Sequence, residues 1–279
     1  IVASVSCIYG IGSVEDYDKM AVRVKTGERR LRDKLLRQLT DIQYHRNDTA
    51  FERGNFRVRG DVVDIYPAGE EAAYRIEFSG DEVERMTQIN PLTGEIEKIL
   101  NKLTIFPGSH YVTPQEKLKR SLNKIRDEAD ERISWFKKQN ELIEAQRLSE
   151  RVKFDLEMLE QTGFVKGIEN YSRYLTNREE GQQPATLMDY FPDDYLLFID
   201  ESHMSIPQVR GMYNGDRARK EVLVEHGFRL PSALDNRPLT FSEFERHMNQ
   251  TIYVSATPAE YELSRSPEPV SQVIRPTGL

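Results

Sequence analysis

The sequence contains a single cysteine and no apolar run long enough to cross a membrane. Cys7 alone excludes a disulfide framework and a cysteine-based zinc site, so a reducing cytoplasm is the expected compartment. A membrane-spanning helix needs about 20 consecutive apolar residues, whereas 30% of this chain is charged and its mean hydropathy is −0.63. We therefore expect a water-soluble cytoplasmic protein without a membrane partner.

A phosphate-binding loop is also missing. P-loop nucleotide hydrolases hold phosphates with the pattern Gly-x-x-x-x-Gly-Lys-[Ser/Thr], and no segment of the chain matches it. The nearest glycine pair, Gly10 and Gly12, lacks the lysine and is interpreted as a tight turn after a strand at residues 1–9. The chain opens without methionine, and residues 274–279 are typical of a linker. These features predict an internal piece of a longer protein.

The charge is acidic overall and basic in one segment. The formal net charge of −7 argues against a protein that coats DNA through bulk electrostatics. Residues 21–60 nevertheless contain eleven Lys or Arg and five Asp or Glu, a local surplus of six positive charges. Because domains usually have about 100 to 150 residues, a chain of 279 residues has room for roughly two. We therefore expect a local basic face on one of these domains.

An apolar strand at residues 195–199 ends in Asp200, Glu201 and, after one serine, His203. Continuous apolar runs of this kind are typical of buried parallel strands, and ligands bind beyond the carboxyl ends of such strands. In nucleotide hydrolases one carboxylate holds Mg²⁺, usually through water, and a neighbouring group orients the attacking water. The histidine would then sense the γ-phosphate. The pattern predicts an α/β fold with a nucleotide site at this strand end.

A second strand, at residues 251–254, ends in Ser255 and Thr257. Hydroxyls at such a position suit a loop that signals between nucleotide and nucleic acid, and we expect the two strand ends to lie side by side. Each motif alone has a simpler interpretation, the acids as a helix N-cap with a first-turn carboxylate and the hydroxyls as a capped turn. Both simpler interpretations would have to hold together, so the nucleotide site is favoured.

Residues 21–112 are predicted to form an inserted α+β domain. A helix at residues 28–43 has Leu31, Leu35, Leu36 and Leu39 on one face, and the antiparallel strands that follow it lie at residues 55–59, 61–66, 74–78, 82–86 and 102–106. Residues 79–81 are the turn of a hairpin.

Alternation along the first of these strands puts Arg57 and Arg59 on the same face, downstream of Arg46 and Arg53. These arginines are either ordinary surface charge or the contact for an acidic partner protein or a phosphate backbone.

The rest of the chain is predicted to be largely helical. Thr113 is the expected N-cap of a long helix with Pro114 at its first position, and the helical pattern breaks near residues 139–140 and ends at Gly163. A short helix follows at residues 168–175. Two segments read as loops that either track a nucleic-acid backbone or serve as plain connections, residues 208–216 and 229–239.

Five segments together resemble the UvrB family, the helicase-like damage-verifying subunits of bacterial nucleotide excision repair. They are residues 55–67, 167–175, 198–203, 228–239 and 251–258. The resemblance implies an incomplete RecA-like motor domain of the P-loop NTPase and superfamily 2 helicase type, formed by residues 1–20 and 113–279. The domain at residues 21–112 would be inserted into it, and a linker would lead to a missing second motor domain.

The resemblance also implies roles for the strand-end residues. Asp200 would hold Mg²⁺ through water, Glu201 would be the water-activating base, and His203 would complete the motif. Ser255 and Thr257 would couple the state of the nucleotide to DNA. ATP and Mg²⁺ are the implied cofactors of the full protein. This chain alone is expected to be inactive and to bind neither tightly, since it lacks the phosphate-binding loop.

The implied partners are UvrA, damaged DNA and UvrC. UvrA would bind residues 21–112 through Arg46, Arg57 and Arg59, and Tyr9 and Arg229 are candidate DNA contacts. UvrC would bind the full protein through regions absent from this chain. The alternative is a UvrA-binding module without chemistry, as in the transcription-repair coupling factor. Such a module would not be expected to keep the acidic and hydroxyl motifs.

Overall fold

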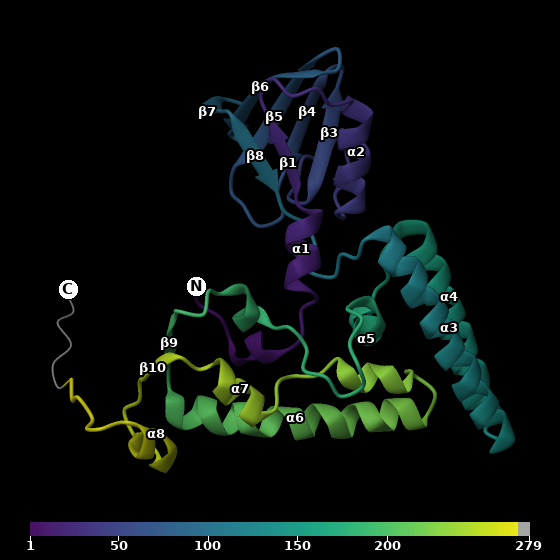
Figure 1. Cartoon of the computed structure of the whole chain (residues 1–279), viewed down its shortest axis with the longest axis vertical. Helices are drawn as coiled ribbons and strands as arrows, with labels where there is room; N and C mark the ends of the chain where they lie inside the picture. Colours follow the sequence, from purple (N-terminus) through teal and green to yellow (C-terminus); the bar gives the residue numbers. More distant parts are fainter. Residues whose placement is uncertain (273–279) are drawn as a thin grey trace. The chain divides into compact units, whose positions relative to one another are not determined.

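The computed structural model describes residues 1–272 of the chain, so the predicted linker at residues 274–279 lies outside the described residues. The fold is mixed α/β and divides into two compact units (Figure 1). The first unit combines residues 1–10 and 183–221 with the chain from residue 237 on, and the second combines residues 11–182 and 222–236. The predicted domain boundaries stay a prediction.

A six-stranded sheet forms part of the second unit. Its strands follow one another in chain order and pair antiparallel, except for a short parallel first pair. They are β2 (His45–Arg46), β3 (Asn55–Arg59), β4 (Val62–Tyr66), β5 (Ala73–Ser79), β6 (Glu82–Ile89) and β7 (Ile96–Leu100). The predicted antiparallel sheet is confirmed. The predicted hairpin turn is confirmed too, because Gly80 links β5 and β6 with a φ of 61°, in the left-handed region.

Two further strands and a helix complete this part of the unit. β1 (Val22–Lys25) pairs antiparallel with β8 (Lys102–Ile105), and α2 (Arg32–Asp41) contributes Leu35 and Leu39 to the same apolar core as the sheet. The helix is shorter than predicted. Arg30 donates its backbone N–H to the carbonyl of Asp81, which ties the preceding residues to the sheet instead. Leu31 precedes the helix and is exposed, so its predicted place on the apolar face is wrong.

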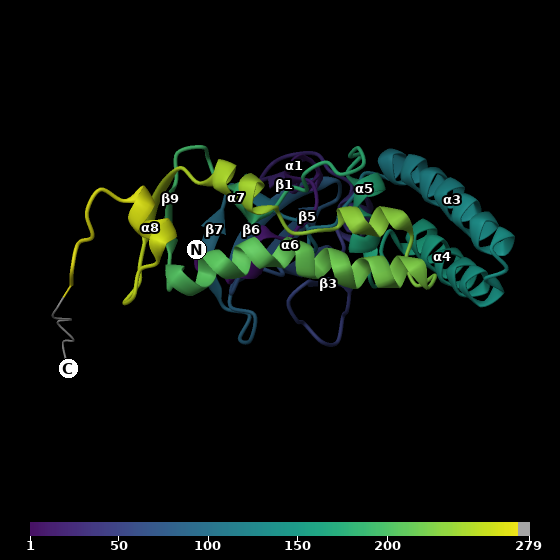
Figure 2. The same ribbon diagram turned by 90° about the horizontal axis from the view of Figure 1, so that it is seen from below.

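A helical hairpin follows, made of α3 (Gln115–Lys138) and α4 (Leu142–Thr162). The two helices lie side by side in both views (Figures 1 and 2) and share an apolar core. The predicted break and stop are confirmed, since Asn140 has a φ of 63° and Gly163 caps α4 with a φ of 70°. The predicted Thr113 cap is wrong. Pro114 is the N-cap, because its ψ of 141° is still extended and its carbonyl accepts the first helical bond from Leu118.

Short elements connect these parts of the second unit. α1 (Val14–Met20) precedes β1, and η2 (Ile168–Tyr171) runs into α5 (Ser172–Leu175), which confirms the short helix predicted there. η4 (Pro231–Asp235) forms one turn of 3-10 helix within residues 229–239, which were predicted as a loop. Several contacts join η4 to η2 and α5, so this segment is packed rather than free.

The first unit contains a parallel strand pair, β9 (Leu196–Ile199) and β10 (Gln250–Tyr253). Its other elements are η1 (Val5–Ile8), η3 (Leu187–Tyr190), α6 (Ser202–Glu225), whose last residues belong to the second unit, α7 (Phe241–His247) and α8 (Glu260–Arg265). Among residues 1–272, no helix combines the length and apolarity that a membrane crossing requires.

Two predictions for this unit are wrong. Residues 1–9 form no strand, because Cys7 and Tyr9 donate their N–H groups to carbonyls three residues back and close 3-10 turns. Residues 208–216 are not a loop but lie inside α6. Gly211 and Gly215 each cost a helix about 1 kcal/mol, yet Ile206 and Val209 of the same helix are buried in the unit's apolar core. Burial of that face outweighs the local preference.

Candidate functional site

The parallel register of β9 and β10 brings their carboxyl ends together. Ile199 lies opposite Tyr253, and Val254 donates its N–H to the carbonyl of Ile199 at 2.9 Å. A second backbone hydrogen bond joins the same two segments, because Ser202 donates its N–H to the carbonyl of Val254 at 3.0 Å. The predicted juxtaposition of the acidic and hydroxyl strand ends is therefore confirmed.

A side-chain contact joins the two motifs. The hydroxyl of Ser255 lies 2.8 Å from Nδ1 of His203, and Oε2 of Glu201 lies 3.5 Å from the same nitrogen. Thr257 donates its backbone N–H to the Ser255 hydroxyl oxygen at 3.0 Å, which helps to hold this hydroxyl beside the ring. With 24% of its side chain exposed against 64% for Glu201, His203 is the inner member of this group. It stands between the acid and the hydroxyl.

The backbone turn after β9 presents both carboxylates to solvent. Asp200 and Glu201 are exposed, and Glu201 has a φ of 43°, an uncommon conformation for a residue with a side chain. Asp200 accepts the N–H of Glu201 on Oδ1 at 3.0 Å, a bond that lies ahead of α6. Its side chain therefore does not cap α6 in the way that the simpler interpretation required.

The donor set suits a magnesium ion shared with a phosphate ligand. No group of three or more His, Cys, Asp or Glu side chains in residues 1–272 could hold a metal ion alone. Mg²⁺ in phosphate-handling sites is usually bound by one or two carboxylates together with water and phosphate oxygens. The exposed oxygens of Asp200 and Glu201 fit that arrangement.

The three predicted partner-binding arginines lie on neighbouring strands but differ in their surroundings. Arg57 on β3 forms an ion pair with Asp64 on β4 at 2.9 Å, and its guanidinium lies 4.2 Å from the ring centroid of Phe51. Only 16% of its side chain is exposed. The expectation that Arg57 is a solvent-facing charge like Arg59 is wrong, because a buried carboxylate across the strand pair holds it.

Asp64 is the centre of this ion cluster. Arg75 on β5 contacts its Oδ1 at 2.7 Å, so one buried carboxylate accepts bonds from two arginines. Burial raises the pKa of Asp64, but the hydrogen bonds from Arg75 and Arg57 outweigh burial and hold this pKa below its ordinary value. Sequence reasoning missed the cluster, and the only signal available was a lone acid within the apolar strand β4.

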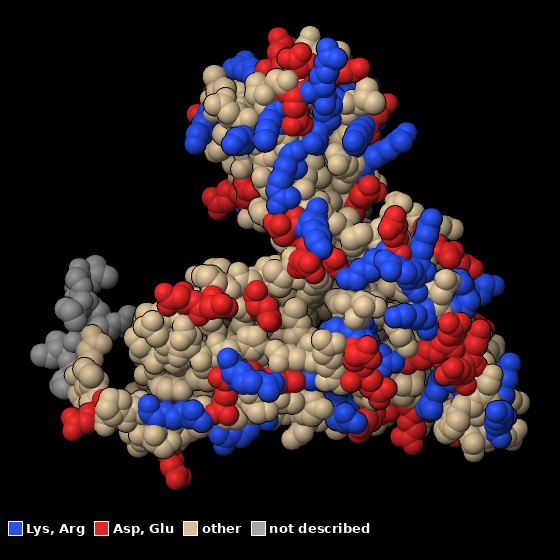
Figure 3. Space-filling view, viewed as in Figure 1, with Lys and Arg blue, Asp and Glu red and all other residues tan. Residues whose placement is uncertain are grey.

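Arg46 and Arg59 are the exposed members of the set. Arg46 on β2 pairs with Asp48 at 2.9 Å, and about half of each side chain is exposed. The hydrogen bond from Arg46, then that from the Val58 N–H, lowers the pKa of Asp48. Arg59 is exposed at the end of β3 and has no ion-pair partner in the part of the chain that the structure describes. The visible face of this part of the unit carries charges of both signs (Figure 3).

The two candidate DNA contacts belong to different units. Tyr9 is half-buried, and its hydroxyl donates to Asp216 at 3.4 Å. Burial, and then the charge of Asp216, raises the pKa of Tyr9. Arg229 is half-buried and donates to the carbonyl of Phe228 at 2.9 Å. Each side chain already has an internal partner, and their roles stay a prediction.

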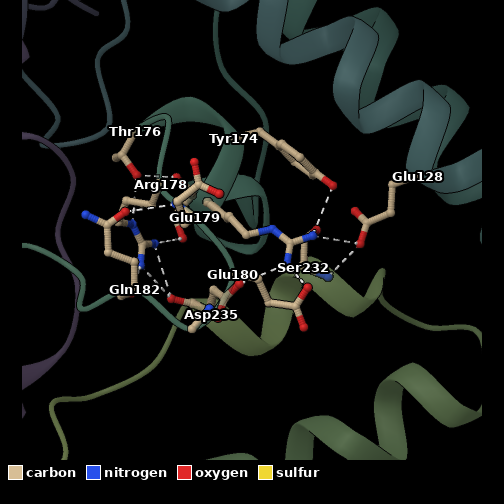
Figure 4. Close-up of polar contacts among 12 residues, drawn as sticks. Glu128, Tyr174, Thr176, Arg178, Glu179, Glu180, Gln182, Ser232 and Asp235 are labelled. Carbon is tan, nitrogen blue, oxygen red and sulfur yellow. Dashed lines mark hydrogen bonds and ion pairs between the residues drawn. The ribbon is translucent and has the colours of Figure 1, made fainter.

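Sequence reasoning missed a second ion cluster, which includes Glu128, Ser232 and Asp235 (Figure 4). Arg173 contacts Asp235 at 3.0 Å and Glu128 at 3.4 Å, and Glu128 also accepts the N–H of Ser232 at 2.8 Å. The nearby Arg178 donates to the Asp235 carbonyl. The cluster ties α3, α5 and η4 together. Glu128 is 45 positions from Arg173, and Arg173 is 62 positions from Asp235, so local pattern gave no signal.

The structure is a mixed α/β chain in which the ends of β9 and β10 bring acidic and hydroxyl side chains together. Comparisons with known proteins identify its family. A family model described as the UvrB interaction domain matches residues 22–111, and one described as the UvrB third helical domain matches residues 116–177. The chain is 58% identical to UvrABC system protein B of Bacillus licheniformis. The identity is 59% for the protein of that name from Halalkalibacterium halodurans and 57% for that from Caldicellulosiruptor saccharolyticus.

These alignments cover the whole chain, over 280 positions, and 42% of each relative. The chain therefore belongs to the UvrB family, as the motifs predicted, and spans about two fifths of the length of these relatives.

Proposed function

We propose that the chain is the nucleotide-responsive and UvrA-docking part of a UvrB subunit that acts in UvrABC nucleotide excision repair. In the full protein it would use ATP to load on damaged DNA and verify the lesion before incision with UvrC. Family membership supports the pathway, and the paired strand ends support the use of nucleotide. The parallel β9–β10 pair is also consistent with part of a RecA-like motor domain.

The residues at the strand ends have distinct proposed roles. Asp200 holds Mg²⁺ through water, and Glu201 accepts a proton from the water that attacks the γ-phosphate. The bound Mg²⁺ supplies charge neutralisation at the phosphates. A movement of Glu201 would shift His203 and, through their contact, Ser255. Thr257, on the same loop, would transmit this movement to the surface that contacts DNA. The observation that carries this proposal is the 2.8 Å contact between His203 and Ser255, which links the acidic end to the hydroxyl loop.

The test is Glu201→Gln in the full-length protein. Glutamine keeps the shape of the side chain and removes the base, so the variant should bind ATP with unchanged affinity while DNA-stimulated turnover falls at least about 100-fold. Wild-type turnover would place the base elsewhere.

UvrA docking is proposed for the interaction domain at residues 22–111, with Arg46 and Arg59 as direct contacts. Arg57 would contribute as well, although its pair with Asp64 gives it a folding role first. DNA is the proposed partner of Tyr9 and Arg229. UvrC would bind parts of the full protein outside this chain.

A non-catalytic docking module is the second candidate, favoured by the missing phosphate-binding loop. The chain alone is expected to act in this way, with UvrA capture and without ATP turnover. A capture assay with immobilised UvrA, run beside a phosphate-release assay, tests both parts. Measurable DNA-stimulated turnover by the chain alone would contradict the assignment.

A further inference from the structure

The hydroxyl loop between β10 and α8 is exposed along most of its length. From Ala256 to Ala259 every residue is exposed, so the loop has little packing of its own. Its upstream end is fixed by backbone hydrogen bonds of Val254 with Ile199 and Ser202 and by the contact of Ser255 with His203. Its downstream end enters α8, whose attachment to the rest of the unit therefore determines where the loop ends.

Tyr261 is the residue that attaches α8. Its hydroxyl donates to Glu245 on α7 at 2.9 Å, and its ring meets Phe241 edge-on at a centroid distance of 5.5 Å. The same ring meets Tyr253, the last residue of β10, at 6.0 Å and 90°. Tyr261 thus touches both α7 and the strand from which the loop departs.

Charged groups reinforce this attachment. Arg265, one turn further along α8, pairs with the same Oε1 of Glu245 and lies 4.6 Å from the Tyr261 ring centroid. Arg210 on α6 lies 4.4 Å from the Phe241 centroid and 5.5 Å from that of Tyr261. Arginine over an aromatic face within about 6 Å is attractive. α6, which has His203 in its first turn, and α8 therefore meet at one aromatic group.

We propose that Tyr261 is a positioning residue for the nucleotide site, which holds the downstream end of the hydroxyl loop so that Ser255 stays on His203. This inference rests on the proposed function. Tyr261 acts through Ser255 and not by contact with the nucleotide. Movement of α8 is thereby transmitted to the acidic strand end, and a change at the acidic end is transmitted to α8.

The experiment is a double-mutant cycle in the full-length protein, with DNA-stimulated ATP turnover as the measurement. Tyr261→Ala and Ser255→Ala should each lower kcat about tenfold and leave the KM for ATP within about twofold. The double variant should be no slower than Ser255→Ala alone, because both changes break the same contact. Tyr261→Phe keeps the ring contacts and should retain more than about half of the wild-type kcat.

Phe191→Ala is the matched control, since it also removes a partly buried ring from the first unit, one that contacts Tyr195 and not the loop. Its effect should multiply with that of Ser255→Ala. The inference is overturned if Tyr261→Ala turns over ATP at the wild-type rate, or if its effect multiplies with that of Ser255→Ala to about 100-fold. Full turnover by Glu201→Gln would instead overturn the proposed function, and the inference with it.

Discussion

Reversing the charge of Arg57 should destabilise the interaction domain, whatever its effect on partner binding. Arg57→Glu would place a second carboxylate where a guanidinium now contacts Asp64 at 2.9 Å, next to a side chain that is only 3% exposed. Removing one partner of a buried ion pair costs about 3 to 5 kcal/mol. Arg75 remains on Asp64 and Arg57 is partly exposed, so the lower end, about 3 kcal/mol, is expected.

The assay is urea unfolding of the chain followed by far-ultraviolet circular dichroism. Trp135, the one tryptophan, lies on α3, so its fluorescence reports on the helical hairpin and not on the sheet. With a typical slope of about 1 to 3 kcal/mol per molar urea, a loss of 3 kcal/mol moves the midpoint by about 1 to 3 M.

Arg59→Glu is the matched control, because its side chain is exposed on the same strand. It should leave the midpoint nearly unchanged while it weakens UvrA capture. An Arg57→Glu chain as stable as the wild type would refute the role given to the Asp64 cluster. Unchanged capture by Arg59→Glu would mean that this face is ordinary surface.

Three further predictions concern stability and can be checked by thermal or urea unfolding. Gly12→Ala should destabilise the second unit by about 1 to 3 kcal/mol, because φ is 100° and an added Cβ would lie 2.4 Å from the His110 carbonyl oxygen. Asp235→Ala should cost a similar amount, since its carboxylate accepts hydrogen bonds from Arg173 at 3.0 Å and from the Gly181 N–H at 2.9 Å, and alanine would leave both donors without this partner. Asp64 has a lower pKa in the folded chain than in the unfolded chain, where the pKa of an aspartate is about 4, so the ionised group stabilises the fold above that pH. The free energy of unfolding should therefore fall as the pH drops from about 4 through the folded pKa. Asp64→Asn removes this titration and should weaken the pH dependence of stability.

The sheet and the strand ends could be predicted because their patterns are local. Alternation along residues 55–59 and the continuous apolar run at residues 195–199 both gave strands. β7 was not predicted because it is an edge strand with four exposed residues, which leaves no buried face to set a period. The glycines within α6 indicated a loop, and only packing of Ile206 and Val209 against distant residues corrects that interpretation.

In the candidate site, too, some features follow from local sequence patterns and others depend on contacts between distant residues. Asp200 and Ser255 could be placed together because parallel neighbouring strands end at the same edge of a sheet. The surroundings of Arg57 could not be predicted, because the burial of Asp64 depends on the register of three strands. Tyr261 gave no signal of its own in the sequence. Its role follows from contacts with α7 and β10, which no spacing of residues along the chain encodes.

The central claim is that the acidic strand end and the hydroxyl loop form one nucleotide site. The most direct measurement is the proton magnetic resonance of His203 in the full-length protein, assigned by its loss in His203→Gln. Saturating Mn²⁺–ATP should broaden this imidazole signal severely, because the paramagnetic ion would be held beside Asp200, and Mg²⁺–ATP should leave it sharp. A His203 signal that stays sharp with Mn²⁺–ATP bound would contradict the claim.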